Sequence, residues 1–284
     1  MKTGFIGLGH LGRAMAKRLL SEGVELIVWN RTAEKAADLG ATVAASPADL
    51  AAAADVIFMN LFDSGAVRSV LSGAGGILAA DCSGRIIIDT STNHFEDVLH
   101  FHKMLKEKGA SYLESPVLGS VVPAAQGSLT ILVSGEKTAY DSALPLIEKI
   151  GRNIFYLEKP ALATKMKLIN NLVLGSLMAT LAEAITFAEA AGIEKASAID
   201  MLLAGAGNSA VLHAKKEKLL HEDFSTQFSS ALIYKDLHYL QDLAFRLKRP
   251  LFTGAAAKEL FGMTFSREIA DQDFSAVYEI IKGL

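Results

Sequence analysis

The chain has 284 residues, of which 51% are hydrophobic, and its formal net charge is −3. This length can bury a substantial core, and the weak acidic balance gives no indication of nucleic-acid binding. The segment HAKKEKLLHE (213–222) mixes basic with acidic residues, which predicts a solvated helix face. Cys82 is the only cysteine, so no intramolecular disulfide can form, and a reducing, cytoplasmic setting is favoured.

Neither a signal peptide nor a membrane span is predicted. Arg13 interrupts the short glycine-rich start of the chain, which is unlike a secretory signal. The longest uncharged run, residues 168–182, has 15 residues and contains two asparagines. Because crossing a bilayer takes about 20 mostly apolar residues, we expect a buried helix there.

Residues 1–160 alternate β-rich with helical segments. The β-rich segments are TGFIGLG (3–9), ELIVWN (25–30), VIFMNL (56–61), RIIIDT (85–90), SYLESP (111–116), LTILVSG (129–135) and NIFYL (153–157). The helical segments include RAMAKRLLSEG (13–23), AEKAADLG (33–40), SPADLAAAA (46–54), FEDVLHFHKMLKEKG (95–109) and AYDSALPLIEKIG (139–151). This alternation predicts an α/β domain with a doubly wound, mostly parallel sheet and helices on both faces.

After Pro160 the pattern becomes entirely helical. Helices are expected at roughly 161–190, 194–204, 208–221, 230–248, 254–268 and 273–283. We therefore predict two domains, an α/β domain over 1–160 and an all-α domain over 161–284, joined through the long helix that begins the second.

The motif G-L-G-H-L-G follows the first β-rich segment and opens the first helix. Gly7 permits a tight turn, Gly9 lets the backbone approach a pyrophosphate, and Gly12 allows helix and strand to pack closely. The helix N-terminus adds amide donors and a positive dipole. The alternative is that the glycines serve only the turn. The predicted cofactor contacts in this loop are Gly7, Leu8, Gly9, His10, Leu11 and Gly12.

The end of the second β-rich segment indicates which dinucleotide binds. An acidic residue there would bind the 2′-hydroxyl of NAD, but this segment ends with Asn30, Arg31 and Thr32 and has no carboxylate. Arg31 can make charge-assisted bonds to a 2′-phosphate, and the other two side chains add neutral donors. NADP(H) is therefore the predicted cofactor; the alternative is an ordinary surface arginine with mixed cofactor use.

Several segments occur in an order typical of one family. They are GFIGLGHLGRAMAKRLL at the start, IIDTST (87–92), SPVLGSVVPAAQGSLTILVSG (115–135), KMKLINN (165–171), YKDL (234–237) and DQDFSAV (271–277). Over its whole length the chain resembles the β-hydroxyacid dehydrogenases, which include 3-hydroxyisobutyrate dehydrogenases and glyoxylate/succinic semialdehyde reductases. The resemblance implies a Rossmann-type NADP-binding domain, a helical substrate and oligomerisation domain, and a homodimer or homotetramer built through the long helix.

The resemblance also implies roles for single residues. Leu61 borders the cofactor, Thr92 lies near the nicotinamide, and Lys235 contacts the cofactor and reaches toward the substrate. The family's D-A-P-V-S-G-G substrate loop is matched by residues 114–120, in which Leu118 replaces the serine that helps to bind the substrate carboxylate.

Backbone N–H groups of Gly119 and Ser120 remain as anion donors in this loop. The P-V-x-G-S form is closer to the glyoxylate/succinic semialdehyde reductases than to the isobutyrate enzymes. A strand end and turn without a ligand is the alternative interpretation.

Reduction of a carbonyl by NADPH needs a proton at the oxygen, which a positioned lysine can donate. In KMKLINN, helical spacing gives Lys167 polar neighbours on its own face, Asn170 and Asn171, whereas Lys165 has only apolar ones. The family pattern of a lysine followed four residues later by asparagine also falls on Lys167 and Asn171. The alternatives are a solvated helix-end charge for Lys167 and a surface charge pair for Lys235 with Asp236.

The sequence thus predicts an NADPH-dependent oxidoreductase that reduces small aldehyde acids, of the glyoxylate or succinic semialdehyde type, to hydroxy acids. In this prediction Lys167 is the general acid, and the substrate-binding residues are Leu118, Gly119, Ser120, Lys167, Asn171 and Lys235. The alternatives are a 3-hydroxyisobutyrate-type dehydrogenase, an imine reductase and a non-catalytic NADP-binding module. No metal site is expected from His94, His100 and His102.

Overall fold

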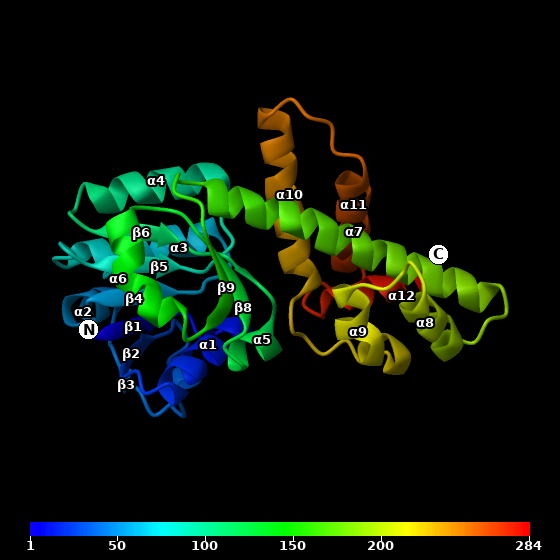
Figure 1. Ribbon diagram of the computed structural model, residues 1–284, viewed down its shortest axis with the longest axis horizontal. Coiled ribbons are helices and arrows are strands. Elements are labelled where there is room, and N and C mark those ends of the chain that lie inside the picture. Colours follow the sequence, from blue (N-terminus) through cyan, green and yellow to red (C-terminus); the bar gives the residue numbers. More distant parts are fainter. The chain divides into compact units, whose positions relative to one another are not determined.

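The computed structural model describes residues 1–284 and divides them into two compact units, Met1–Lys167 and Leu168–Leu284. The sequence-based domain boundary at residues 160 and 161 lies at the turn before helix α7 (Leu162–Ala190), and the boundary between the two units lies inside this helix. Helix α7 therefore begins in the first unit and ends in the second (Figure 1).

The first unit is built on a six-stranded sheet in which every neighbouring pair is parallel, in the order β3-β2-β1-β4-β5-β6. Its strands are β1 (Thr3–Ile6), β2 (Leu26–Trp29), β3 (Thr42–Val43), β4 (Val56–Met59), β5 (Ile86–Asp89) and β6 (Ser111–Glu114). The strand order reverses between β1 and β4, which is where such sheets bind ligands beyond the carboxyl ends of their strands. The predicted Rossmann-type α/β fold is confirmed.

A second, three-stranded sheet contains β7 (Val117–Leu118), β8 (Leu129–Val133) and β9 (Gly151–Tyr156). Strand β7 is antiparallel to β8, and β9 is parallel to it. The sequence pattern located β8 and β9 but did not show that they leave the main sheet. The cause is long-range pairing, since the chain crosses from one sheet to the other after Glu114, whose backbone pairs with that of Ser134.

The helices of the first unit agree in part with the prediction. They are α1 (His10–Ser21), η1 (Ala33–Ala36), α2 (Pro47–Ala53), α3 (Ser64–Ser72), η2 (Ile77–Ala79), α4 (Phe95–Lys106), α5 (Val121–Ala125) and α6 (Lys137–Ile147). The helix expected over 33–40 is only a short 3₁₀ turn, because that segment buries just Ala36 and Leu39. Helix α3 was not predicted; the carboxylate of Asp63 caps it by accepting a hydrogen bond from the Ala66 N–H.

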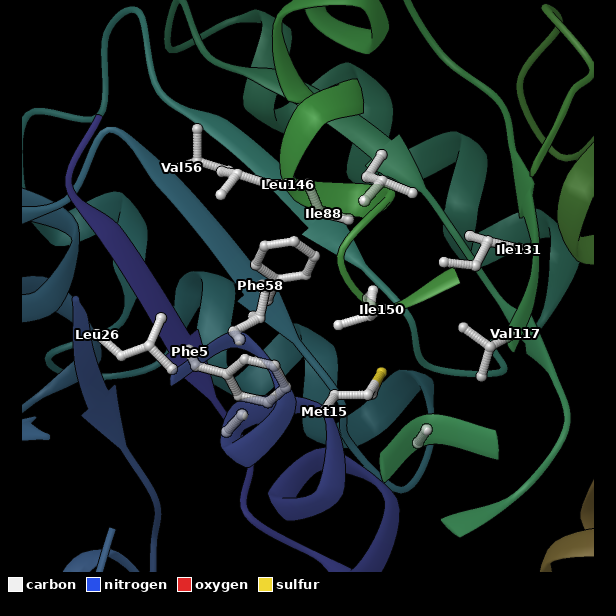
Figure 2. Close-up of a cluster of buried hydrophobic side chains, with 14 of the residues drawn as sticks. Phe5, Met15, Leu26, Val56, Phe58, Ile88, Val117, Ile131, Leu146 and Ile150 are labelled. Carbon is white, nitrogen blue, oxygen red and sulfur yellow. The ribbon is translucent and has the colours of Figure 1, made fainter. Parts of the chain in front are cut away.

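The main core of the first unit joins the two sheets. Its members come from β1, β2, β4, β5 and β6 of the large sheet, from β7 and β8 of the small one, and from α1, α5 and α6 (Figure 2). The rings of Phe5 and Phe58 stack with their centroids 5.9 Å apart. Burial of this apolar surface holds the strands in register, so that their carboxyl ends and the loops after them are firmly placed.

The second unit is entirely helical, as predicted. Besides most of α7 it contains α8 (Lys195–Ala204), α9 (Ala210–His221), α10 (Ser230–Arg246), α11 (Thr253–Ser266), η3 (Phe274–Ala276) and α12 (Val277–Lys282). Helix α10 packs along α11. Gly175 of α7 allows a close approach to α10, because a Cβ atom there would lie 3.1 Å from the Leu237 side chain.

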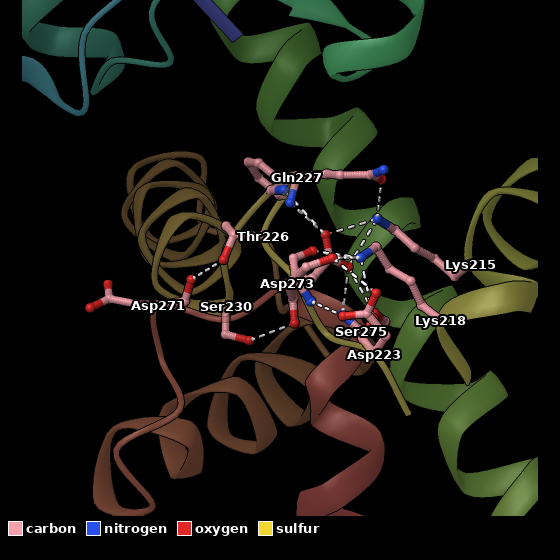
Figure 3. A network of polar contacts seen from close by, with 11 residues as sticks. Lys215, Lys218, Asp223, Thr226, Gln227, Ser230, Asp271, Asp273 and Ser275 are labelled. Atoms are coloured by element: carbon pink, nitrogen blue, oxygen red, sulfur yellow. Dashed lines mark hydrogen bonds and ion pairs between the residues drawn. The ribbon is translucent and has the colours of Figure 1, made fainter. Parts of the chain in front are cut away.

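The prediction of a solvated face for residues 213–222 is wrong for two of its lysines. Lys215 and Lys218 are buried, and Lys215 Nζ lies 2.9 Å from the carboxylate of Asp273 (Figure 3). Lys218 Nζ donates to the hydroxyl of Ser225 at 2.8 Å. The partners of these lysines lie beyond the helix, in the loop after α9 and before η3, so charge patterning within the helix did not reveal them.

Helix α7 is long and apolar enough to cross a membrane by length and composition alone. Of its most apolar 18-residue window, 44% is buried within this chain. One such helix is weak evidence for a membrane span, since a core helix of a soluble protein can meet the same criteria of length and composition.

Candidate active site

The three glycines of the phosphate-binding motif have distinct steric surroundings. Gly7 has φ +95°, and a Cβ atom on it would lie 2.2 Å from the carbonyl oxygen of Asn60. A Cβ atom on Gly12 would lie 2.1 Å from the carbonyl oxygen of Gly7. A Cβ atom on Gly9, in contrast, would meet no protein atom within 4 Å. Gly7 and Gly12 are therefore required by the fold, whereas the open space at Gly9 suits the approach of a pyrophosphate.

The turn before α1 is braced by Asn30. Its Oδ1 accepts a hydrogen bond from the Leu8 N–H at 2.8 Å, and its Nδ2 donates to the Thr32 carbonyl at 2.8 Å. Asn30 thus holds the glycine loop against the end of β2. Arg31 and Thr32, which follow it, are exposed. No side chain caps α1, whose first turn also lacks acidic residues. These residues fit a dinucleotide that carries a 2′-phosphate.

The loops after β4 and β5 are tied to each other. Asn60 Nδ2 donates to the hydroxyl of Thr90 at 3.0 Å, and the Leu61 N–H donates to the hydroxyl of Ser91 at 2.8 Å. Leu61 and Thr92, the two predicted cofactor contacts here, are both half-buried. The arrangement places both predicted contacts on linked loops beyond the carboxyl ends of neighbouring strands.

Asp89, at the end of β5, is the buried anchor of these loops. It accepts hydrogen bonds from the Ser91 N–H at 2.9 Å, from Asn93 Nδ2 at 2.8 Å and from the Tyr112 hydroxyl at 2.7 Å. Burial raises the pKa of the Asp89 carboxyl, and the three donors oppose that rise. Burial and the neighbouring Asp89 likewise raise the pKa of Tyr112 well above its ordinary value. The network ties the segment before Thr92 to the ends of β5 and β6.

The predicted substrate loop begins buried and ends partly exposed. Glu114 and Ser115 are buried, Leu118 and Ser120 are half-buried, and Gly119 is exposed. Leu118 lies in β7, where it pairs with Thr130 of β8. Gly119 has φ +122°, a conformation that favours glycine. Leu118, which replaces the family's serine, is thus the last residue of β7, and the chain turns directly after it at Gly119.

The lysine singled out from the sequence is buried. Lys167 is 7% exposed, whereas Lys165 is half-buried and places its Nζ 5.9 Å from the centre of the Phe95 ring. The helix that carries both lysines begins without an N-cap side chain of its own. Its first turn instead donates hydrogen bonds to the side chains of Glu114, at the end of β6, and Ser134, in the loop after β8.

Within the second unit, Asn171 is bound by a residue of α10. Its Nδ2 donates to Asp236 Oδ2 at 2.6 Å, and its Oδ1 accepts from Asn170 Nδ2 at 3.2 Å. Lys235 Nζ lies 2.9 Å from the other Asp236 oxygen. Asn171 and Asp236 are buried, and the Lys235 side chain is 12% exposed. Lys235 and Asp236 do form an adjacent charge pair, but it is not on the surface.

Three buried carboxylates carry much of this geometry, and the sequence pattern did not indicate that any of them is a buried anchor. They are Asp89, Glu114 and Asp236. Each is an acid next to residues that were singled out, in IIDTST, before SPV and in YKDL. An acid at the end of an apolar β-rich segment is the signal that could have identified Asp89 and Glu114, whereas Asp236, next to Lys235, carries no such signal.

The remaining cysteine and histidine candidates show no arrangement for catalysis or metal binding. Cys82 is buried, and burial raises the pKa of its thiol, which disfavours the thiolate that a nucleophile needs. His94 caps α4, and His102 Nε2 lies 3.8 Å from Glu114 Oε1. No group of three metal-ligating side chains is found in the chain.

Two family models cover nearly the whole chain. Residues 2–157 match the NAD binding domain of 6-phosphogluconate dehydrogenase, and residues 162–281 match the NAD-binding domain of NADP-dependent 3-hydroxyisobutyrate dehydrogenase. Glyoxylate/succinic semialdehyde reductase 1 of Arabidopsis thaliana is 34% identical over 285 residues, which are 99% of each chain. The chain belongs to the β-hydroxyacid dehydrogenase family. It is an NAD(P)-dependent β-hydroxyacid dehydrogenase, as the sequence predicted.

Solved structures agree with this assignment. The dehydrogenase superimposes on a 3-hydroxyisobutyrate dehydrogenase from Salmonella typhimurium with a TM-score of 0.92 and 27% identity, over 99% of each chain. A second structure, Psf3 in complex with NADP⁺ and 2-OPP, gives a TM-score of 0.89 and 30% identity, over 98% of this chain and 99% of that one. The family models and this complex support NADP(H) as the cofactor of the dehydrogenase.

Proposed function

We propose that this dehydrogenase reduces small aldehyde acids, of the glyoxylate and succinic semialdehyde type, to hydroxy acids, with NADPH as the preferred cofactor and Lys167 as the general acid. The observation that carries the proposal is the buried lysine on α7, one helical turn before an asparagine that Asp236 holds in place. The 34% identity to a plant glyoxylate/succinic semialdehyde reductase supports the substrate class.

In the proposed mechanism, bound NADPH supplies the hydride that the carbonyl carbon accepts. Lys167 donates a proton from Nζ to the carbonyl oxygen as negative charge develops there. The amide nitrogen of Asn171 carries two hydrogens, and Asp236 accepts one of them. The other can bind the substrate oxygen, so that Asn171 orients the carbonyl toward the acid.

Substitution of each of the two lysines of KMKLINN tests whether Lys167 is the general acid. Lys167→Ala removes the proton donor and is expected to lower kcat by roughly 10²- to 10⁴-fold. Lys167→Arg keeps the positive charge but donates a proton poorly, so it should be nearly as inactive. Lys165→Ala is the matched control, since this lysine packs over Phe95. Turnover of glyoxylate and succinic semialdehyde, together with NADPH affinity, is measured for each variant.

Two outcomes contradict this proposal. Tight NADPH binding by a wild type that turns over no aldehyde acid rules out the reductase. Full turnover by Lys167→Ala rules out the proton donor. Oxidation of 3-hydroxyisobutyrate by the wild type, with no reduction of glyoxylate or succinic semialdehyde, favours the second candidate, which the 0.92 TM-score to a 3-hydroxyisobutyrate dehydrogenase supports.

The substrate preference is proposed to depend on Leu118. An apolar side chain at this position cannot donate a hydrogen bond to a carboxylate, so the backbone of Gly119 and Ser120 must serve the anion. Leu118→Ser is expected to raise kcat/KM for aldehyde acids relative to uncharged aldehydes of the same length, by roughly tenfold for one added hydrogen bond to a charged group. An unchanged preference would mean that the residue does not face the substrate carboxylate.

We also propose that the dehydrogenase is a cytoplasmic homodimer or homotetramer. Leu162, Met166, Ile169 and Val173 recur at helical spacing along α7 and are 39% to 55% exposed in the single chain. Such an apolar stripe is typical of a face that a second copy covers. Light scattering after size-exclusion chromatography measures the mass, and a monomer at micromolar concentration contradicts the proposal.

A further inference from the structure

Glu114 and Ser134 form a buried pair at the start of the predicted substrate loop. Their exposed fractions are 1% and 0%, and their backbones exchange two hydrogen bonds, at 3.1 and 3.0 Å, as an isolated antiparallel bridge. Glu114 ends β6 and immediately precedes the loop residues 115–120. The Ser115 N–H donates to the Asp89 carbonyl at 2.7 Å. Backbone hydrogen bonds to Ser134 and to Asp89 therefore fix where the substrate loop begins.

The same two side chains cap helix α7. An α-helix begins with four N–H groups that have no partner within the helix. In α7 the N–H of Ala163 donates to Ser134 Oγ at 3.0 Å, and the N–H of Thr164 donates to Glu114 Oε2 at 3.0 Å. The Ala161 N–H and the Thr164 hydroxyl also donate to the Glu114 carboxylate.

The remaining amide of the first turn, that of Leu162, donates to the Lys159 carbonyl at 3.2 Å. All four N-terminal amides of α7 are thus satisfied, and three of them by the Glu114 and Ser134 side chains. A carboxylate side chain is also favoured at this end of a helix, where the backbone N–H groups leave a positive partial charge. Because both side chains are buried, water cannot replace them without a change of structure.

From these contacts we infer that Glu114 is a positioning residue for the reaction, which joins the substrate loop to the helical turn that carries Lys167. The backbone of Glu114 sets where residues 115–120 begin, and its carboxylate sets where α7 begins. Lys167 follows Thr164 by three residues, so a shift of the first turn moves Nζ relative to the loop. A misplacement of about 1 Å can lower a rate by roughly a hundredfold. The inference rests on the proposed role of Lys167.

Glu114→Gln tests this arrangement. The amide keeps the size of the side chain but presents an NH₂ group where one acceptor oxygen faces a backbone N–H. We expect kcat per NADPH-binding site to fall roughly tenfold to a hundredfold, with the KM for NADPH unchanged. Glu136→Gln is the matched control, because that carboxylate is 56% exposed. A purely structural role would lower Tm and the number of binding sites but leave kcat per site at the wild-type value, which would overturn the inference.

A milder pair of variants guards against misfolding of Glu114→Gln. Thr164→Val removes only the hydroxyl that donates to Glu114, whereas Thr164→Ser keeps it. We expect Thr164→Val to lower kcat several-fold and Thr164→Ser to stay closer to the wild type. Equal kcat values in the two variants would contradict the positioning role.

Amide hydrogen exchange gives a readout that needs no substrate. In Glu114→Gln, peptides covering 115–120 and 161–167 should both exchange faster than in the wild type, while the glycine loop at 7–12 is unaffected. Faster exchange in 161–167 alone would show that Glu114 only caps the helix, and the inference would fail. If the wild type reduces no aldehyde acid, the proposed function fails, and the exchange pattern alone decides whether Glu114 joins loop and helix.

Discussion

The side-chain amide of Asn171 donates to Asp236 Oδ2 over 2.6 Å, and both side chains are buried. The second oxygen of Asp236 lies 2.9 Å from Lys235 Nζ. A single carboxylate on α10 therefore orients two of the residues that the sequence pattern selected. Its position fixes which way the Asn171 amide faces, and this direction is what a substrate-orienting residue requires.

Asp236→Asn is expected to lower kcat roughly tenfold to a hundredfold. The new amide cannot neutralise Lys235 and can accept from Asn171 only in one of its two orientations. Steady-state turnover measures the effect, and near-native NADPH affinity separates it from unfolding. Asp242→Asn, on an exposed position of the same helix, serves as the control and should behave as the wild type.

Two glycine substitutions in one motif should both weaken NADPH binding but differ in their effect on Tm. Gly7→Ala forces a Cβ atom to 2.2 Å from the Asn60 carbonyl oxygen at φ +95°, so it should lower both Tm and NADPH affinity. Gly9→Ala meets no protein atom within 4 Å and should keep the wild-type Tm while weakening NADPH binding by roughly tenfold. Thermal unfolding and fluorescence titration distinguish them. A lowered Tm in Gly9→Ala would show that this glycine serves the fold.

Arg31→Ala should weaken NADPH binding by roughly tenfold to a hundredfold and leave NADH binding almost unchanged, since hydrogen bonds to a charged group contribute about 1.5–3 kcal/mol. The ratio of the two dissociation constants is the measurement. Arg152→Ala removes another exposed arginine of the same unit and should not change the ratio. Equal loss of both cofactors would indicate that Arg31 does not contact the 2′-phosphate.

Removing either member of the buried Lys215–Asp273 ion pair should lower the unfolding free energy, but by different amounts. Asp273→Asn leaves the Lys215 charge without a counter-ion and is expected to cost about 3–5 kcal/mol of unfolding free energy. Lys215→Met should cost less, because Asp273 still accepts from the N–H groups of Gln227, Phe228 and Ser275. Urea unfolding measures both. Lys216→Met, which breaks a partly exposed pair, should change stability by less than about 1 kcal/mol.

Stability should depend on pH through Glu222. Hydrogen bonds from Lys195 and Lys282 lower the pKa of its carboxyl to about 2 in the folded protein. A lowered folded-state pKa means that this stabilisation is full above the unfolded pKa, near 4.3, and is lost as the pH falls through about 2.

Glu222→Gln should therefore lower the unfolding free energy at pH 7 by about 0.2–1 kcal/mol, as for partly exposed pairs. The difference from the wild type should shrink as the pH falls below about 4. Urea unfolding at several pH values measures it. A difference that stays constant with pH would mean that the charge of Glu222 is not what stabilises the protein.

Local patterns were sufficient for the Rossmann-type fold, the helical second half and the family. The glycine motif depends on steric requirements that lie within one turn, and Lys167 and Asn171 share a helix face because of the 3.6-residue repeat. Residues such as Leu118 could be located by motif, since the loop around them is continuous in sequence.

What the sequence by itself determined about this protein is thus its architecture, its family and its cofactor class, and it named the candidate residues of the site. Only the tertiary structure decided which groups hold them. Asp89, Glu114 and Asp236 receive their donors from other strands, loops or helices, as Lys215 receives Asp273. The physical reason is that a buried charge is satisfied by whichever groups the fold brings within about 3 Å, and many of these partners are distant along the chain.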